Sequence, residues 1–321
     1  MAVIEIPINS LDPQQFIAEQ VEKISAIVRD GSAINALSGG VDSSTVTLIA
    51  HRALGDRLKT CFIDTALMRQ DEPQQVVSVF ARLGVHVELV DAREEFLKAL
   101  KGITDPEEKR EAVTQTFYRH VFGRLVRESG AKFLLQGTIL TDVDETVAGI
   151  KRQHNVFEQL GIDPKQAFGY QIIEPLIQLR KDGVRKVAQA LGLPASICDR
   201  MPFPGPGLAA RVIGEATAER LELARQATAV TEAALASIGA FQCMAILHED
   251  RVTGMREGRR QFGCQIEIRC WESVDARTAR PLRVHWDTLE ALSRRILGEM
   301  PAVVSVTYNI APKPPSTMEA V

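Results

Sequence analysis

The chain has 321 residues, 45% of them hydrophobic and 25% charged, and a formal net charge of -3. This composition is ordinary for a globular protein of about two domains, and it excludes the strongly basic surface of nucleic-acid-binding proteins. No apolar run approaches the roughly 20 residues of a membrane-spanning helix, and no basic segment precedes an apolar one at the N-terminus. The five cysteines are scattered and form no C-x-x-C pair, which argues against a disulfide framework or a structural zinc site. We therefore expect a cytoplasmic protein without nucleic-acid or membrane partners.

The first helix is predicted between Asp12, which can cap its N-terminus, and Gly31, which follows its end. A short apolar run over residues 33–37 then predicts a buried strand, and residues 45–54 predict a helix that stops at Gly55. Between this strand and helix lie seven residues: Ser38, Gly39, Gly40, Val41, Asp42, Ser43 and Ser44.

These seven residues have the chemistry of a phosphate-binding loop. The two glycines lack a Cβ and let the backbone approach a ligand, while the serines place hydroxyl and N–H groups at the positive end of the following helix. The loop has no lysine of the usual nucleotide P-loop, and its aspartate would repel phosphate without a cation. We interpret it as a loop that holds pyrophosphate together with bound metal. The alternative is an ordinary glycine-rich turn.

Strands and helices then alternate along the chain. Strands are predicted at 58–63, 85–90 and 132–136, and helices at 72–83, 92–100 and 106–128. The alternation predicts an α/β fold with a doubly wound, mostly parallel sheet covered by helices on both faces. Polar residues follow three of the strands, at Ser38–Gly40, Asp64 and Gln136–Thr138. Ligands bind beyond the carboxyl ends of such strands, so we expect these residues to meet in one crevice.

Two later segments interrupt this pattern. Residues 147–171 are polar and long, which is typical of a lid. Residues 201–213 are rich in proline and glycine, and they predict a junction between a first domain, 1–200, and a second, 214–321. Three prolines within 201–207 exclude a helix or a central strand there. Composition alone favours a stiff linker over a rigid wall against a planar ligand.

The second domain has a different pattern. A helix is predicted at 216–237, strands at 242–248 and 262–270 with Gly254 and Gly258 between them, a helix at 286–297 and a strand at 303–310. This is a small α+β unit and a candidate for oligomerisation. Proline holds residues 311–317 extended, and we expect the chain end to be frayed.

Several spaced motifs occur in a characteristic order. They are the Ser38–Ser44 loop; Asp64 with Arg69 and Glu72; TDPEEKR at 104–110; Gln136–Thr138 with Asp142, Val143 and Glu145; IEPL at 173–176; Lys181-Asp182; Arg200; residues 202–208 with Arg211; and Lys313-Pro314-Pro315 with Thr317 and Glu319. With these motifs, the chain from about Phe16 to Glu319 resembles GMP synthetase, in its ATP-pyrophosphatase (PP-loop) and dimerisation portion.

The resemblance implies an ATP-dependent ligase of purine biosynthesis. In that family AMP is transferred from ATP to a carbonyl oxygen of xanthosine monophosphate, pyrophosphate leaves, and ammonia displaces AMP to give GMP. By resemblance, ATP and Mg²⁺ are cofactors, Asp42 and Asp142 orient the metal, and Lys181 neutralises charge on the leaving group. The resemblance also assigns ATP binding to Ser38, Gly39, Gly40, Val41, Asp42, Ser43, Ser44, Asp64, Gly137 and Thr138.

The resemblance further implies a site for the acceptor nucleotide, with Lys313 taking its 5′-phosphate. Arg200 or Arg211 would assist, and the remaining acceptor residues would be Arg69, Thr317 and Glu319. Residues 202–208 then become a wall of that site, and the second domain forms a homodimer. No glutaminase domain precedes this chain, so ammonia would come from a separate glutamine amidotransferase subunit or from solution.

Departures from the family concentrate in the acceptor half. The lid carries Phe157 and Glu158 where the family has two glycines, Met201 replaces a histidine, and the chain ends in Met318-Glu319-Ala320-Val321. Two alternatives therefore stay open: a related PP-loop enzyme that adenylates a different purine-like carbonyl for amine or sulfur insertion, and a non-catalytic ATP-binding protein. Sulfur insertion would need an activated thiol, and Cys264 and Cys270 share one face of a predicted strand.

Overall fold

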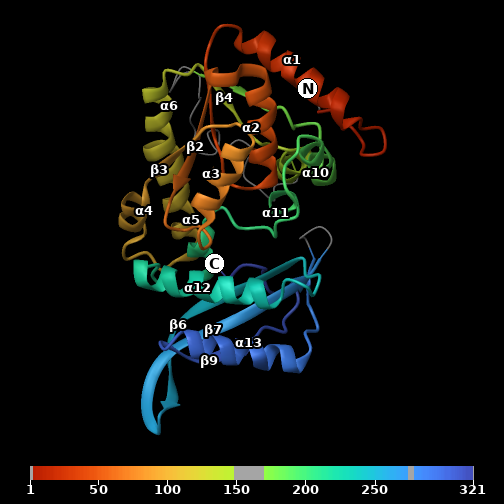
Figure 1. Cartoon of the computed structure of the whole chain (residues 1–321). Coiled ribbons are helices and arrows are strands. Elements are labelled where there is room, and N and C mark those ends of the chain that lie inside the picture. Colours follow the sequence, from red (N-terminus) through yellow and green to blue (C-terminus); the bar gives the residue numbers. More distant parts are fainter. Residues whose placement is uncertain (1–2, 148–169, 274–277, 321) are drawn as a thin grey trace. The chain divides into compact units, whose positions relative to one another are not determined.

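The computed structural model describes residues 3–147, 170–273 and 278–320 (Figure 1). The chain divides into two compact units. The first consists of Met1–Asp64, Glu72–Asp91 and Phe117–Arg200, and the second of Thr65–Asp71, Ala92–Thr116 and Met201–Val321. Two segments that the predicted boundary assigns to the first domain, 65–71 and 92–116, thus belong to the second unit. All but the ends of the predicted lid, 147–171, lies outside the described residues.

The first unit is built on a five-stranded parallel sheet. Its strands are β1 (Ala33–Ala36), β2 (Leu58–Asp64), β3 (Val87–Asp91), β4 (Phe133–Leu135) and β5 (Gln171–Ile173). They lie in the order β3-β2-β1-β4-β5, and every neighbouring pair is parallel. After β3 the chain returns to the other side of β1, where it adds β4 and then β5. This is the arrangement of a doubly wound sheet and confirms the predicted fold class.

Helices cover both faces of this sheet. The helices on one side include α1 (Pro13–Val28), α2 (Val41–Leu54) and α10 (Lys181–Ala190), which pack against one another. In Figure 1, α6 (Gly123–Ser129) lies on the opposite side of the strands. The other α-helices in the described part of the unit are α3 (Glu72–Arg82), α7 (Leu140–Val147) and α11 (Ala195–Cys198). None of the helices in the described part of the chain is long and apolar enough to cross a bilayer.

The long helix predicted over 106–128 contains a π-helical segment in its middle. It consists of α5 (Pro106–Gln115), a π-helical segment (Thr116–Phe122) and α6. A π-turn inserts an extra residue into the helical ladder, and here it accompanies an aromatic cluster in which Phe117 and Phe122 stack with centroids 6.1 Å apart. The boundary between the two units also falls within this stretch, after Thr116. The stretch is helical throughout, as predicted, but the sequence pattern did not indicate the π-helical winding of its middle.

The second unit is built on a long β-hairpin. Its strands β6 (Gln242–Arg256) and β7 (Arg259–Glu272) pair antiparallel, and β8 (Arg280–Pro281) and β9 (Val303–Tyr308) both pair with β7. The α-helices in its described part are α4 (Arg93–Leu100), α5, α12 (Ala218–Ala234) and α13 (Trp286–Glu299). The chain turns at Glu257 and Gly258, which have φ of 51° and 75°, as a two-residue hairpin turn requires.

The strands of this hairpin are longer than predicted because Gly254 is not a turn residue. A Cβ at Gly254 would lie 2.6 Å from the Cβ of Val304, and one at Gly263 would lie 2.6 Å from its Cγ1. Both glycines therefore give Val304 of β9 room to approach the hairpin backbone. A glycine between two predicted strands is typical of a loop, but at Gly254 the reason for glycine is close packing between strands.

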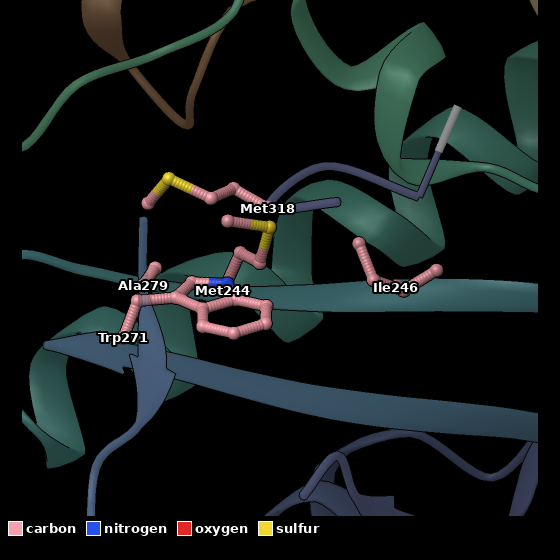
Figure 2. Close-up of a cluster of buried hydrophobic side chains, with 5 residues drawn as sticks. All are labelled: Met244, Ile246, Trp271, Ala279 and Met318. Atoms are coloured by element: carbon pink, nitrogen blue, oxygen red, sulfur yellow. The ribbon is translucent and has the colours of Figure 1, made fainter. Parts of the chain in front are cut away.

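The end of the chain is anchored, which makes the prediction of a frayed terminus wrong for residues 312–320. Lys313 exchanges two backbone hydrogen bonds with Ala279, of 2.8 and 3.1 Å. Met318 is buried with Met244, Ile246 and Trp271. Figure 2 shows the Met318 side chain lying over Met244 and the Trp271 ring. Burial of this one side chain fixes the position of its neighbours Thr317 and Glu319.

Glu267 on β7 is the centre of a polar network in the same unit. Its carboxylate lies 2.8 Å from His248 Nε2, and it accepts hydrogen bonds from Arg269 Nε at 2.6 Å and Asn309 Nδ2 at 2.9 Å. Burial by itself would raise the pKa of Glu267, but hydrogen bonds from His248, Asn309 and Arg269 outweigh it and lower the pKa to about 2. The charged form of Glu267 thus stabilises the folded unit.

We predict that Glu267→Gln lowers the free energy of unfolding by up to about 3 kcal/mol at neutral pH, the equivalent of a pKa lowered from 4.5 to about 2. Because the folded-state pKa is depressed, this contribution is complete above pH 4.5 and is lost as the pH falls towards 2. The measurement is urea unfolding at several pH values. Tryptophan fluorescence reports on this unit, which contains both tryptophans of the chain, Trp271 and Trp286.

The control is Glu272→Gln on the same strand, which removes a solvent-exposed ion pair with Arg280. Exposed pairs contribute less than about 1 kcal/mol. Equal unfolding free energies for the two variants at pH 7 would contradict the prediction.

Candidate active site

The three polar strand ends lie on one edge of the parallel sheet. β1 pairs with β2 on one side and β4 on the other, so the loop after β1, Asp64 at the end of β2 and Gln136–Thr138 after β4 share the carboxyl edge. The strand order reverses between β1 and β4, and doubly wound sheets bind ligands at such a point. The fold therefore directs the Ser38–Ser44 loop to the position expected of a ligand site.

The loop is held in shape by its own serines. Ser38 N–H donates to Ser43 Oγ at 3.1 Å, the two hydroxyl oxygens lie 2.8 Å apart, and Ser43 Oγ donates to Gly40 O at 3.2 Å. Gly39 has φ of 75°, a left-handed conformation that glycine adopts without strain. Gly40 caps α2 with no side-chain hydrogen bond, so the first N–H groups of this helix remain available to an anion.

A buried polar chain supports the loop from below, and the sequence reasoning missed it. Thr60 Oγ1 donates to Asn35 Oδ1 at 2.8 Å, and Asn35 Nδ2 donates to Thr47 Oγ1 at 2.6 Å. Thr47 Oγ1 in turn donates to Ser43 O at 2.8 Å. All three side chains are buried. The available signal was an asparagine inside a predicted buried strand, because a buried amide needs hydrogen-bonding partners.

Asp42 and Lys181 form an ion pair at the start of two helices. Lys181 Nζ, on the first residue of α10, lies 2.6 Å from Asp42 Oδ2 in the first turn of α2. Asp142, in the first turn of α7, accepts a hydrogen bond from Ile139 N at 3.0 Å. Burial raises the pKa of Asp42, Lys181 opposes this effect, and the charge of Asp142 adds to it. The three predicted catalytic residues are therefore within electrostatic reach of one another.

The residues present fit a magnesium ion coordinated jointly with a nucleotide. Asp42 Oδ1 is buried and has no hydrogen-bond partner among the described residues, and Asp142 adds a second carboxylate nearby. The described residues contain no group of three or more His, Cys, Asp or Glu side chains arranged for a metal. Mg²⁺ is commonly bound by one or two carboxylates plus substrate phosphates and water, so two carboxylates suffice.

Gly137 brings the end of β4 close to the loop. A Cβ at this position would lie 3.1 Å from Ser43 N and 3.2 Å from the carbonyl carbon of Asp42. The next residue, Thr138, donates from Oγ1 to Glu174 Oε1 at 2.6 Å. Gly137 thus allows close approach to the loop backbone, and Thr138 ties the end of β4 to the residue that follows β5.

A second cluster lies within the second unit and contains most of the predicted acceptor residues. Arg69 Nε binds both carboxylate oxygens of Glu232, at 3.0 and 3.2 Å, and its Nη2 donates to Met201 O at 3.0 Å. The guanidinium carbons of Arg69 and Arg211 lie 4.2 and 4.6 Å from the centroid of the Phe203 ring. Because two arginines make cation–π contacts with its ring, Phe203 is packed within the second unit.

Arg211 is fully buried, and its three side-chain nitrogens have no hydrogen-bond partner among the described residues. Its Nη1 lies 3.8 Å from Glu232 Oε1 and its Nε lies 3.5 Å from Glu319 Oε2. Burial lowers the pKa of Arg211, while Glu319 and Glu232 oppose this effect. Residues 207–211 form a buried 3₁₀ helix, so the C-terminal part of the predicted junction is packed within the second unit.

The C-terminal residues reach the same cluster. Gln242 Nε2 donates to Glu319 Oε1 at 2.9 Å, and Thr317 Oγ1 donates to Glu319 O at 2.6 Å. Lys313 is placed on the same anchored tail by its backbone pairing with Ala279. Glu232 and Gln242 were missed by sequence reasoning, because an acidic residue on an Ala-rich helix and a polar residue at a strand start carry no motif.

One predicted acceptor residue, Arg200, lies elsewhere. It belongs to the first unit, where its Nη1 is 2.7 Å from Glu72 Oε1 and 3.4 Å from Gly39 O. Arg200 is therefore next to the phosphate-binding loop.

Four of the five cysteines are withdrawn from solvent. Cys61, Cys198, Cys243 and Cys270 are buried, and Cys264 is half-buried. Burial raises the pKa of Cys61 to about 12 and also raises the pKa of Cys198. A thiol for sulfur transfer would need a lowered pKa, so Cys61 and Cys198 give no support to sulfur insertion.

The fold and the loop are those of an ATP-using class of enzymes. Residues 25–256 match the family described as asparagine synthase, and residues 230–320 match the GMP synthase C terminal domain. The chain is 46% identical over 309 residues to a subunit of the glutamine-hydrolyzing GMP synthase of Archaeoglobus fulgidus, covering 96% of this chain and 99% of that protein. It is 47% identical to the corresponding subunit of Methanosarcina barkeri (96% and 98% covered) and 44% identical to that of Pyrococcus furiosus (95% and 97%). The chain belongs to this family of GMP synthase subunits.

We predict that Gly137→Ala reduces ATP-dependent turnover at least tenfold. The new Cβ would press on the backbone of Asp42 and Ser43, so the loop must shift by a few tenths of an ångström. The measurement is steady-state kinetics together with thermal unfolding. Gly298→Ala on α13, where a Cβ meets nothing within 4 Å, is the matched control and keeps full activity. Wild-type kinetics for Gly137→Ala would show that this contact does not position the loop.

Proposed function

We propose that this chain uses ATP to convert xanthosine monophosphate to GMP. AMP is transferred from ATP to a carbonyl oxygen of the base and pyrophosphate leaves. Ammonia then attacks the activated carbon, and AMP departs with the former carbonyl oxygen. The proposal is supported by membership of the family of GMP synthase subunits over nearly the whole chain. The structural observation that carries it is the lysine-free Ser38–Ser44 loop at the switch point of the sheet, beside the Asp42–Lys181 pair.

In this mechanism the loop acts on the leaving pyrophosphate. Attack at the α-phosphorus builds negative charge on the β- and γ-phosphates, and preorganised N–H groups at the start of α2 stabilise that charge. Lys181 adds a positive charge at the same place, and it is half-exposed, so it can contact a phosphate. Asp64, Gly137 and Thr138 border the ATP site on the same strand edge. No side chain needs to form a covalent bond.

Mg²⁺ is the metal that the residues fit. We propose that Asp42, through its unpartnered Oδ1, and Asp142 hold the ion in the presence of ATP phosphates. When bound, the ion neutralises developing charge on the pyrophosphate. Metal binding would also favour the charged form of Asp42, whose pKa is otherwise raised by burial.

For the acceptor nucleotide we propose the cluster of the second unit. Lys313 binds the 5′-phosphate, and Arg69, Thr317 and Glu319 are further residues that contact the nucleotide. Arg211 is completely buried, so its part is to hold Glu319 and Phe203 in position. Glu319 is held in the same cluster by Gln242, whose Nε2 donates to Glu319 Oε1 at 2.9 Å.

The relatives are named as one subunit of a glutamine-hydrolyzing enzyme. We propose that a separate glutaminase subunit supplies ammonia to this chain in the cytoplasm, and that free ammonium replaces that subunit in vitro.

The test is to incubate the chain with Mg-ATP, ammonium and xanthosine monophosphate. Equal amounts of AMP, pyrophosphate and GMP are expected. Glutamine in place of ammonium gives no product until a glutaminase subunit is added. If GMP does not form while another purine nucleotide triggers pyrophosphate release, the acceptor has been misassigned.

Two controls accompany this assay. Asp42→Asn removes a carboxylate from the metal and the charge opposite Lys181, and turnover should fall by at least a hundredfold. Chelation of Mg²⁺ with EDTA should stop pyrophosphate release, and added Mg²⁺ should restore it. Full activity in either case would remove the metal from the proposal.

We also propose a homodimer formed through the second unit. The exposed large hydrophobic side chains in the described part of this unit include Met255, Phe262, Trp286 and Ile310. Trp286 borders a cavity of about 310 Å³ between α13 and β9. Sedimentation velocity at micromolar concentration should give twice the 35.3 kDa of one chain, and Trp286→Arg should shift the population towards monomer. A wild-type monomer under these conditions would contradict the dimer.

A further inference from the structure

Arg200 and Glu72 form an ion pair that is largely withdrawn from water. Glu72 is the first residue of α3 and its side chain is 3% exposed, while that of Arg200 is 20% exposed. The distance of 2.7 Å between Nη1 and Oε1 is that of a charge-assisted hydrogen bond. A buried carboxylate holds its partner in place strongly, because separating the two would leave an uncompensated charge.

This pair encloses Gly39, the centre of the phosphate-binding loop. A Cβ on Gly39 would lie 3.1 Å from Arg200 Nη1, 3.1 Å from Glu72 Oε1 and 3.0 Å from Val76 Cγ2. Gly39 is buried, and its backbone is left-handed. The loop backbone therefore rests directly on the guanidinium and the carboxylate.

Arg200 also determines which way one peptide group of the loop points. Its Nη1 donates to Gly39 O at 3.4 Å. In a trans peptide the C=O of Gly39 and the N–H of Gly40 point in opposite directions. Holding the carbonyl towards Arg200 therefore turns the Gly40 N–H into the loop, where it lies 3.4 Å from Ser38 Oγ. A reversed peptide would present a carbonyl oxygen to the phosphates instead of a donor.

We infer that Arg200 is a positioning residue for the pyrophosphate-binding loop, held by Glu72, and not a ligand of the acceptor nucleotide. This inference rests on the proposed function for its assignment of the loop to pyrophosphate. It gives Arg200 a role in the first unit, whereas family resemblance suggested help with the acceptor 5′-phosphate. Glu72 gains a role that no sequence pattern indicated.

The experiment compares two probes that differ by the pyrophosphate group. Calorimetric titration measures the affinity of the full chain for Mg-ATP and for AMP. Arg200→Met should weaken Mg-ATP binding at least tenfold and change AMP binding less than twofold, because AMP lacks the phosphates that the loop holds. In the turnover assay the KM for ATP should rise, while the KM for xanthosine monophosphate should stay within twofold.

Further variants separate positioning from general stability. Arg200→Lys keeps a charge against Glu72 and should fold like wild type, yet recover only part of the ATP affinity, since its compact ammonium lacks the guanidinium fork. Glu72→Gln should show the same ATP selectivity, and the double variant should lose less than the product of the single losses. The matched control is Arg57→Met, which removes a guanidinium that donates to Gly31 O at the opposite edge of the sheet.

Three results would overturn the inference. A raised KM for xanthosine monophosphate with unchanged ATP affinity would return Arg200 to the acceptor site. Equal losses for ATP and AMP in Arg200→Met and Arg200→Lys would indicate a general structural role. Unchanged affinity for both probes would show that the loop does not need Arg200. If the wild type binds Mg-ATP but does not use xanthosine monophosphate, the proposed function fails and the ATP–AMP comparison still decides the role of Arg200.

Discussion

The direction of a few backbone N–H groups is the constraint on which the first unit depends. Ser38–Ser44 has no lysine, so the loop can attract phosphate only through its peptide dipoles, the start of α2 and the neighbouring Lys181. A peptide N–H group stabilises a bound phosphate only if the direction of the N–H is fixed. Three sets of hydrogen bonds restrict rotation of the loop peptides. They come from the hydroxyls of Ser38 and Ser43, from the buried chain through Asn35 and from the guanidinium of Arg200.

The second unit solves a different electrostatic problem, that of keeping several charged side chains buried. The guanidinium groups of Arg69 and Arg211 both contact the Phe203 ring, and Glu232 lies close to both arginines. Arg211 is fully buried, and the carboxylates of Glu232 and Glu319, at 3.8 and 3.5 Å, offset part of the cost of burying its charge. The arginines and the glutamates of this cluster are therefore stable in the interior only together, because removing one partner would leave an uncompensated buried charge.

The sequence predicted the parallel sheet, the loop and the Asp42–Lys181–Asp142 group because each has a local signature or a family motif. It could not predict partners that depend on distant packing. Glu232 meets Arg69 from a helix 163 residues further along, and Gln242 meets Glu319 from 77 residues away. Glycines were ambiguous for a related reason. Gly258 marks a turn and Gly254 marks the approach of Val304, and only the folded chain distinguishes the two.

The division into units has a consequence for the synthesis of this chain on the ribosome. The second unit takes Thr65–Asp71 and Ala92–Thr116 from the early part of the chain and completes itself only after Met201. The ammonium of Lys109 is buried against Val212 O, an acceptor 103 residues later. A ribosome adds about 5–20 residues per second, so Val212 is synthesised roughly 5–20 s after Lys109. The nascent protein must therefore keep an early segment soluble until its C-terminal third appears, and exchange of either unit between relatives at a single crossover would separate residues that fold together.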